Sequence, residues 1–298
     1  MLVDDLRGAC AEVAAAARFV HIDDPALAAF ADALPLDGLQ VEPGYAAGSF
    51  EERAAFVLTL DAINFGSGWF PTIRKRPGLS GYFTVECGLK DRFERSGPWS
   101  ADELATIDAR EVAAVLGQDP EHELVALFAN SLRDLGEHVA RDFQGRFLDV
   151  VGDSAVSLVE LLASWESFFD VSTYAGRPVP FCKRAQIAAS DLAAARVAQF
   201  EDLDRLTLFA DNLVPHVLRL EGVLHYDEGL AERIDAGELI EHGSPEEVEI
   251  RACALHAVEL LARRNTTTAR ELDYLLWNRG QQPRYKAQPR HRARCTAY

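Results

Sequence analysis

The feature that most constrains the fold of this chain is a repeated helix-start signal, a Ser or Thr followed three residues later by Glu. In this arrangement the hydroxyl accepts a hydrogen bond from a helical N–H, and the Glu carboxylate accepts one from the N–H of the Ser or Thr. The signal occurs at Ser49 with Glu52, Ser100 with Glu103, Ser244 with Glu247 and Thr268 with Glu271, and Pro245 takes the first helical position after Ser244. The sequence therefore predicts helices that begin after residues 49, 100, 244 and 268.

Apolar residues three and four apart predict further helices at 119–139, 153–169 and 185–200. Strand patterns are confined to GYFTVEC at 81–87 and RFLDVV at 146–151, and residues 64–82 and 173–181 have the Gly and Pro content of loops. We therefore predict an all-α fold with at most a small peripheral β element. Since no repeat or Gly/Ser-rich linker divides the chain, we expect one globular helical domain over 1–298, or two packed helical lobes with the site between them.

Charge and composition narrow the classes of function. The chain of 298 residues carries a net charge of -17, which opposes sequence-independent binding to a phosphate backbone. It begins with acidic residues and has no run of about 18 apolar residues, so we expect a cytoplasmic protein that does not enter a membrane. Its five cysteines include no CxxC pair, which indicates neither a disulfide framework nor a zinc site.

The C-terminal segment 278–298 has a charge opposite to that of the whole chain. It holds six Lys or Arg residues and no acid. This segment either folds onto the acidic body of the protein or binds a ligand phosphate or RNA, and both can hold together.

The segment LTLFADNLVPHV, residues 206–217, places Asp211 inside an apolar run. On a helix Leu206, Phe209 and Leu213 would share the core face, and Asp211 would lie at its edge. Pro215 lacks an N–H and its ring clashes with the carbonyl four residues back, so the helix should kink or end there. Asp211 is then either a local cap or a buried functional carboxylate, and periodicity alone does not decide between them.

Two further segments suit parts of a nucleotide. Asn64 and Phe65, in the aromatic stretch 61–76, suit a planar base, or they belong to a loop that packs on the core. Lys183 and Arg184 open a helix after a Pro-containing stretch and suit a phosphate, although such a pair is also common on surfaces.

A third segment, ARELDYLLWNRG, brings Asp273, Tyr274 and Trp277 within two turns. A carboxylate beside aromatic rings can accept hydrogen bonds from the ring N–H and amino group of a purine-like base. The alternative is an acid that complements the helix dipole. No paired-histidine metal motif, GxSxG nucleophile motif or phosphate-binding glycine loop occurs, so we expect no metal and no cofactor.

Four segments in order, FCKRAQIAASDL, LTLFADNLVPHVL, GSPEEVEIRACALHAVEL and ELDYLLWNRG, together resemble the queuosine salvage proteins, the queuosine 5'-phosphate N-glycosylase/hydrolases. The resemblance runs from Phe56 to the C-terminal segment. It implies an all-helical fold similar to the helix-hairpin-helix DNA glycosylases. It also implies hydrolysis of queuosine 5'-monophosphate to queuine and ribose 5-phosphate, in the salvage of queuine for tRNA modification.

The resemblance also assigns residues. The family's FAD motif falls on Phe209–Asp211, KRAQ on Lys183–Gln186, DxxLW on Asp273–Trp277, VEIR on Val248–Arg251, and an early histidine of an N-terminal helix pair on His21. Asp211 and Lys183 are then the expected catalytic residues. The expected substrate-binding residues are His21, Asn64, Phe65, Arg184, Phe209, Asp273, Tyr274 and Trp277.

Cleavage of an N-glycosidic bond passes through an oxocarbenium-like sugar, so a carboxylate beneath the anomeric carbon stabilises the developing charge or activates water. We assign that role to Asp211. A deazapurine lacks the usual N7 protonation site, so Asp273 would hold the departing base by its other edge. Lys183 would bind the 5'-phosphate, with Arg184 or the basic C-terminal segment as further candidates. The expected partner is this small nucleotide alone, with no nucleic acid, and the protein is expected to be a monomer. The rival functions are a base-excision DNA glycosylase and a non-catalytic protein that binds a modified nucleotide.

Overall fold

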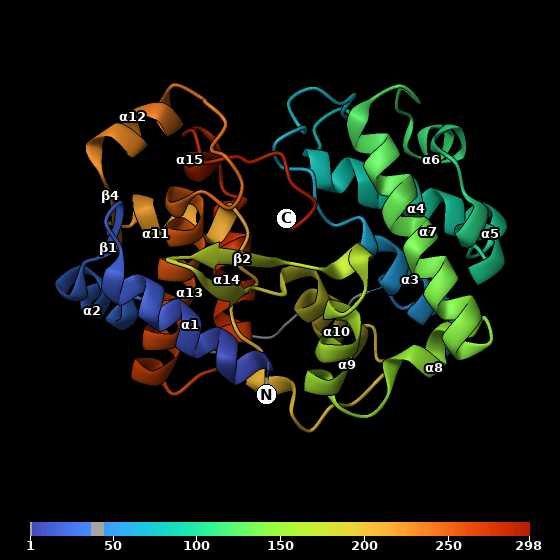
Figure 1. Ribbon diagram of the computed structural model, residues 1–298, viewed down its shortest axis with the longest axis horizontal. Helices are drawn as coiled ribbons and strands as arrows, with labels where there is room; N and C mark the ends of the chain where they lie inside the picture. The colour runs from blue at the N-terminus through green and yellow to red at the C-terminus, as the bar shows by residue number, and fades with distance from the viewer. Residues whose placement is uncertain (1, 37–44) are drawn as a thin grey trace. The chain divides into compact units, whose positions relative to one another are not determined.

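The computed structural model describes residues 2–36 and 45–298, and over these residues the protein is mostly α-helical (Figure 1). Fifteen α-helices accompany four short strands, which form two antiparallel sheets of two strands each in the described part of the chain. The predicted all-α fold with a small β element is confirmed. No helix among the described residues is long and apolar enough to cross a membrane.

The described residues divide into two compact units. The first comprises residues 2–36, 170–183 and 204–294, and the second comprises 45–169, 184–203 and 295–298. The elements of the first unit are α1 (Leu2–Ala16), β1 (Val20–Ile22), α2 (Asp24–Asp32), β2 (Val171–Tyr174), β3 (Arg177–Pro180), α11 (Leu213–Leu220), β4 (Leu224–Tyr226), α12 (Glu228–Asp235), α13 (Pro245–Asn265), α14 (Ala269–Gly280) and α15 (Pro283–Lys286).

Helix α13 is the centre of the first unit, and α1, α2, β1, α11 and α14 all pack against it. In α13 14 of the 21 residues are buried, and the helix is enclosed on every side from Glu247 to Leu255. The charged residues Glu247, Glu249 and Arg251 are buried with the apolar ones. Charges removed from water need partners inside the protein, and these partners organise the unit.

The two sheets lie where the sequence predicts no strand. Strands β2 and β3 form a hairpin, with Val171 opposite Pro180 and Tyr174 opposite Arg177. Its two-residue turn, Ala175 and Gly176, has positive φ at both positions, as the tightest hairpins require. Strands β1 and β4 pair antiparallel across about two hundred residues of sequence, with Val20 opposite Tyr226. Such a long-range pairing leaves no local signal in so short a strand.

Both predicted strands are wrong, because residues 81–87 begin helix α4 (Gly81–Ser96) and residues 146–151 contain the whole of helix α8 (Phe147–Val151). In α4 the buried positions 81, 84, 85, 88, 89 and 93 follow the helical period over the whole element. Gly88 also allows α6 to approach, since a Cβ there would lie 3.0 Å from the Leu116 side chain. Tertiary packing has overridden the local β propensity of this run.

The second unit is a helical bundle. Its elements are α3 (Phe50–Ala62), α4, α5 (Ala101–Thr106), α6 (Ala109–Leu116), α7 (Glu123–Phe143), α8, α9 (Ala155–Ala163), the 3₁₀ turn η1 (Glu166–Phe168), all but the first residue of α10 (Lys183–Ala194), and the start of the 3₁₀ turn η2 (Leu203–Arg205). Helix α7 packs closely on α5 and also contacts α3, α6, α8 and η1. The predicted helices at 119–139, 153–169 and 185–200 correspond to α7, α9 and α10.

All four predicted helix starts are observed, at α3, α5, α13 and α14. The reciprocal pair of hydrogen bonds forms at Ser49, Ser100 and Thr268. At α13 only half of it forms. Ser244 accepts the N–H of Glu247 at 3.3 Å, but the Glu247 carboxylate accepts the N–H of Gly243 at 3.1 Å and lies 3.6 Å from Arg251.

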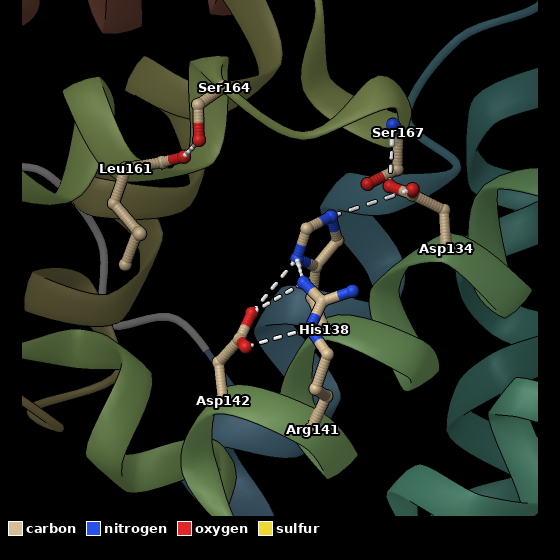
Figure 2. A network of polar contacts seen from close by, with 7 residues as sticks. All are labelled: Asp134, His138, Arg141, Asp142, Leu161, Ser164 and Ser167. Carbon is tan, nitrogen blue, oxygen red and sulfur yellow. Dashed lines mark hydrogen bonds and ion pairs between the residues drawn. The ribbon is translucent and has the colours of Figure 1, made fainter.

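A polar network on α7 holds η1 in place (Figure 2). Asp134, His138 and Asp142 are spaced four apart and so share one face of the helix. Nε2 of His138 lies 3.7 Å from Asp134 and Nδ1 lies 3.2 Å from Asp142, while the His138 ring stacks on Trp165 with 4.4 Å between centroids. Asp134 also accepts the N–H of Ser167 at 2.8 Å, which attaches η1 to α7.

Two helical glycines are predicted to be essential to the packing. A Cβ at Gly136 would lie 2.4 Å from the backbone N of Ala105, and one at Gly280 would lie 2.7 Å from Cγ of Leu213. Gly136→Ala and Gly280→Ala should each lower the free energy of unfolding by about 1–3 kcal/mol, measured by urea denaturation.

Gly8→Ala is the matched control, because Gly8 lies on α1 with nothing within 4 Å of an added Cβ. It should raise the free energy of unfolding by about 0.4–1 kcal/mol through the unfolded state. Similar changes at all three glycines would contradict the close helix contacts.

Candidate active site

Asp211 lies two residues before the start of a helix and not inside one. The predicted helix over 206–217 is wrong, because residues 206–212 are not helical and α11 begins at Leu213. Oδ1 of Asp211 accepts the N–H of Leu213 at 2.7 Å and of Val214 at 3.2 Å, so Asp211 caps α11. Pro215 neither kinks nor ends the helix, since it lies in the first turn, where a missing N–H costs nothing.

The cap leaves one carboxylate oxygen of Asp211 available. Within the described residues Oδ2 accepts no hydrogen bond, and the side chain is only half-buried. The two amide hydrogen bonds fix the carboxylate orientation, and the positive end of the α11 dipole favours its negative charge. The two roles that the sequence leaves open, cap and functional carboxylate, are therefore compatible in one residue.

Asp273 on α14 lies beside the same turn. Its Oδ1 accepts the backbone N–H of Phe209 at 3.1 Å, and Asp273 is buried. Helix α14 approaches α11 closely because Gly280 has no side chain where Leu213 packs. The motif residues 209–211 and 273 are thus brought together, and Tyr274 and Trp277 lie half-buried on the same helix.

Lys183 is connected to the Asp211 turn through two buried charged residues. The Asp170 carboxylate accepts the backbone N–H of Lys183 at 3.0 Å and two hydrogen bonds from Arg251, at 3.0 and 2.7 Å. Nε of Arg251 donates to the carbonyl of Ala210 at 3.0 Å. Lys183 itself is buried, at 4% exposure. The structure therefore joins the two predicted catalytic segments inside the first unit.

Part of the basic C-terminal segment does fold onto acidic residues of its own unit. Nη2 of Arg279 lies 3.0 Å from Glu221, and Arg284 pairs with the same carboxylate. Of the two alternatives that the sequence leaves open for this segment, folding onto the protein's own acidic residues is therefore correct for these two arginines.

Arg290 behaves differently from those two arginines. The chain beside it is fixed, because Asn212 donates to the carbonyl of His291 at 3.1 Å. Burial lowers the pKa of Arg290, and the charge of Asp211 opposes that shift. Among the described residues Arg290 forms no hydrogen bond and no ion pair. A half-buried guanidinium near Asp211 is therefore available for an anion.

Three predicted site residues, Asn64, Phe65 and Arg184, belong to the second unit. Arg184 is fully buried, donates to the carbonyl of Ala62 at 2.6 Å and lies over the Phe65 ring, 4.9 Å from its centroid. Phe65 also meets Phe128 edge to face at 5.0 Å. Asn64 donates to Asp61 at 3.2 Å. These three residues are brought together, and each has a packing role within its own unit.

His21 lies in strand β1, opposite His225, and is exposed. The resemblance implies a histidine on a pair of helices, so this detail of its placement is wrong. Its role as a substrate contact stays a prediction.

Sequence reasoning missed Asp170, the buried acid that joins Arg251 to Lys183. It assigned no role to Glu249, which accepts the N–H groups of Arg18, Phe19 and Val20 at 2.9, 2.6 and 3.1 Å and the hydroxyl of Tyr174 at 2.7 Å. The available signal was the alternation of charged residues at 247, 249 and 251 within an otherwise apolar helix. No three His, Cys, Asp or Glu side chains form a metal-binding group in the part of the chain that the structure describes.

Comparisons with known proteins agree on one family. The family model described as "Queuosine salvage protein" matches residues 45–298. A Sphaerobacter thermophilus protein named queuosine 5'-phosphate N-glycosylase/hydrolase is 39% identical over 265 residues, which cover 83% of this chain and 82% of that protein. Proteins of the same name from Bos taurus and Dictyostelium discoideum are 29% and 30% identical, over 84% and 83% of this chain and 83% and 79% of their own lengths.

Three buried or half-buried histidines of the first unit predict a pH dependence of stability. Burial, with smaller contributions from Arg251 and other cations, lowers the pKa of His291 to about 3, and burial also lowers the pKa of His216 and His256. The unfolded chain, with histidine pKa values near 6.5, binds these protons first as pH falls. The free energy of unfolding should therefore decrease between about pH 6.5 and 3, by up to about 1.4 kcal/mol per pH unit for His291.

Urea denaturation at several pH values measures this slope. His291→Gln should flatten it, and His256→Gln should do so to a smaller extent because His256 is only half-buried. A slope that is the same in both variants and the unsubstituted protein would show that His291 titrates normally in the folded state.

Proposed function

Because this chain belongs to the queuosine salvage protein family, we propose that it hydrolyses the N-glycosidic bond of queuosine 5'-monophosphate, releasing queuine and ribose 5-phosphate. The relatives that share its sequence over most of their length carry the name of that activity. The observation that carries the proposal is the state of Asp211, a carboxylate with one oxygen held by two helix amides and the other open.

Asp211 acts on the sugar. As the glycosidic bond breaks, positive charge develops at the anomeric carbon, and Oδ2 of Asp211 beneath that carbon stabilises it or aligns a water molecule. The amides of Leu213 and Val214 hold Oδ1, so the carboxylate does not have to reorient during the reaction. Such preorganised charge is commonly the largest contribution to catalysis of this kind.

Asp273 recognises the base. A deazapurine cannot leave through protonation at N7, so its departure depends on hydrogen bonds at its other edge. The position of Asp273 beside the turn that carries Asp211 supports this role, in which Phe209, Tyr274 and Trp277 supply flat or apolar surface for the base. Holding the base and the sugar on adjacent segments aligns the bond over Asp211.

Lys183 and Arg290 bind the 5'-phosphate. Lys183 opens α10, and Arg290 is a half-buried cation without an ion pair among the described residues, near Asp211. Arg290 is therefore our choice within the basic segment, whereas Arg184 already has partners in the second unit. His21, Asn64, Phe65 and Arg184 remain substrate contacts predicted from the sequence.

The rival functions explain less. A base-excision enzyme must bind duplex DNA, which a net charge of -17 opposes. A non-catalytic nucleotide-binding protein has no use for an oriented and open Asp211. We therefore propose that the protein acts on the free nucleotide as a cytoplasmic monomer, without nucleic acid, metal or cofactor.

Asp211→Asn should lower kcat for queuosine 5'-monophosphate by about 10³-fold or more while Kd for the nucleotide changes little. The amide oxygen of asparagine still accepts the N–H groups of residues 213 and 214, so the cap and the fold are kept. Release of queuine is followed by mass spectrometry, and a kcat near the unsubstituted value would remove Asp211 from the mechanism.

Lys183→Ala and Arg290→Gln should each reduce the preference for queuosine 5'-monophosphate over the nucleoside by about tenfold or more in kcat/KM. Turnover of the nucleoside should be retained, because it has no phosphate. Arg284→Gln is the control, since Arg284 lies in the same segment but pairs with Glu221. An unchanged preference in the first two variants would place the phosphate elsewhere.

A further inference from the structure

All three guanidinium nitrogens of Arg251 are engaged inside the first unit. Its Nε donates to Ala210, its Nη1 and Nη2 donate to the two oxygens of Asp170, and Nη1 also lies 3.6 Å from Glu247. The guanidinium lies over the Phe181 ring, 3.9 Å from its centroid, and the side chain is fully buried. No part of it is available to contact a substrate.

The hydrogen bonds of Arg251 to Ala210 and Asp170 each reach a segment that carries a proposed functional group. The Ala210 carbonyl belongs to the peptide unit that joins Ala210 to Asp211, so Arg251 holds the backbone at the start of the cap. Asp170 accepts the N–H of Lys183 with its side chain, and its backbone carbonyl accepts the N–H groups of Phe181 and Cys182. Asp170 therefore closes the base of the β2–β3 hairpin at the residue where α10 begins.

A guanidinium is planar, and its N–H groups point in fixed directions within that plane. The bidentate pair with Asp170 fixes the plane, and Nε then fixes where the Ala210 carbonyl lies within it. A lysine at this position could supply the charge, but not three hydrogen bonds in one plane. The hydrogen bonds of Arg251 thus fix the distance between segments 170–183 and 210–211, in addition to attracting the two segments.

We infer that Arg251 is a positioning residue for the reaction, which sets the placement of Asp211 relative to Lys183 without touching the substrate. The inference rests on the proposed function, since it takes Asp211 and Lys183 as the groups to be placed. A buried ion pair is weak evidence of a purely stabilising role, because apolar residues of similar volume often stabilise a core equally well. Apolar residues cannot supply the fixed N–H directions of the planar guanidinium.

Arg251→Lys tests the inference, with Glu247→Gln as the matched control. Glu247 is buried on the same helix and contacts Arg251, but it bonds to neither Ala210 nor Lys183. Both variants should be less stable than the unsubstituted protein. With rates corrected for the folded fraction measured by circular dichroism, Arg251→Lys should lower kcat for queuosine 5'-monophosphate by about 10²-fold with KM within about threefold, while Glu247→Gln keeps kcat within about threefold.

A kcat within about threefold of the unsubstituted value in Arg251→Lys, or an equal loss of kcat in Glu247→Gln, would overturn the inference. If Arg251→Lys fails to fold, Asp170→Asn provides the same comparison, because an amide has one accepting oxygen and cannot accept from both Nη1 and Nη2 of Arg251, as the two carboxylate oxygens do. The proposed function is tested separately by the unsubstituted protein: if it releases no queuine, that function fails, whereas normal release with an unaffected Arg251→Lys variant refutes only the positioning role.

Discussion

The interaction on which the first unit depends is the buried ion pair between Arg251 and Asp170. Its partners lie 81 residues apart in the sequence and are completely removed from water, so neither charge is tolerable without the other. The same guanidinium binds the Ala210 carbonyl, and the same carboxylate binds the N–H of Lys183. One polar contact therefore determines where three separate segments of the chain meet.

Helix α13 supplies most of the charges that make such contacts possible. Glu249 accepts three backbone N–H groups at the start of strand β1, and Glu247 accepts the N–H of Gly243 and contacts Arg251 at the start of the helix. These carboxylates thus satisfy backbone groups that lie mostly outside regular secondary structure. A central helix with internal charges thus substitutes for a large sheet in organising irregular loops.

Sequence patterns correctly predict the features that depend on residues close together in the chain. The capping boxes at Ser49, Ser100 and Thr268 each involve residues three apart, and they mark helix starts correctly. The wrong helix at residues 206–217 also has a local cause, because Pro215 lies in the first turn of α11 and does not break a helix. The apolar residues before it are buried in a segment without regular secondary structure and not on a helix face.

The features that could not be predicted depend on partners far away in the sequence. The β pattern at residues 81–87 was overridden by packing against α6, and nothing near Asp170 in the sequence announces its pairing with Arg251. For Asp211 the motif resemblance indicated a role in catalysis, and periodicity indicated a cap or a functional acid. Only the structure shows that the cap uses one carboxylate oxygen of Asp211 and leaves the other available.

The central claim is that this open oxygen faces the anomeric carbon of a bound nucleotide. A crystal structure of the Asp211→Asn variant with queuosine 5'-monophosphate tests it directly, since the substitution preserves the cap while slowing turnover. The expected result is a side chain at position 211 within about 3.5 Å of the anomeric carbon, with the base against Asp273 and the phosphate against Lys183 and Arg290. An anomeric carbon more than about twice that distance away, with another carboxylate beside it, would contradict the claim.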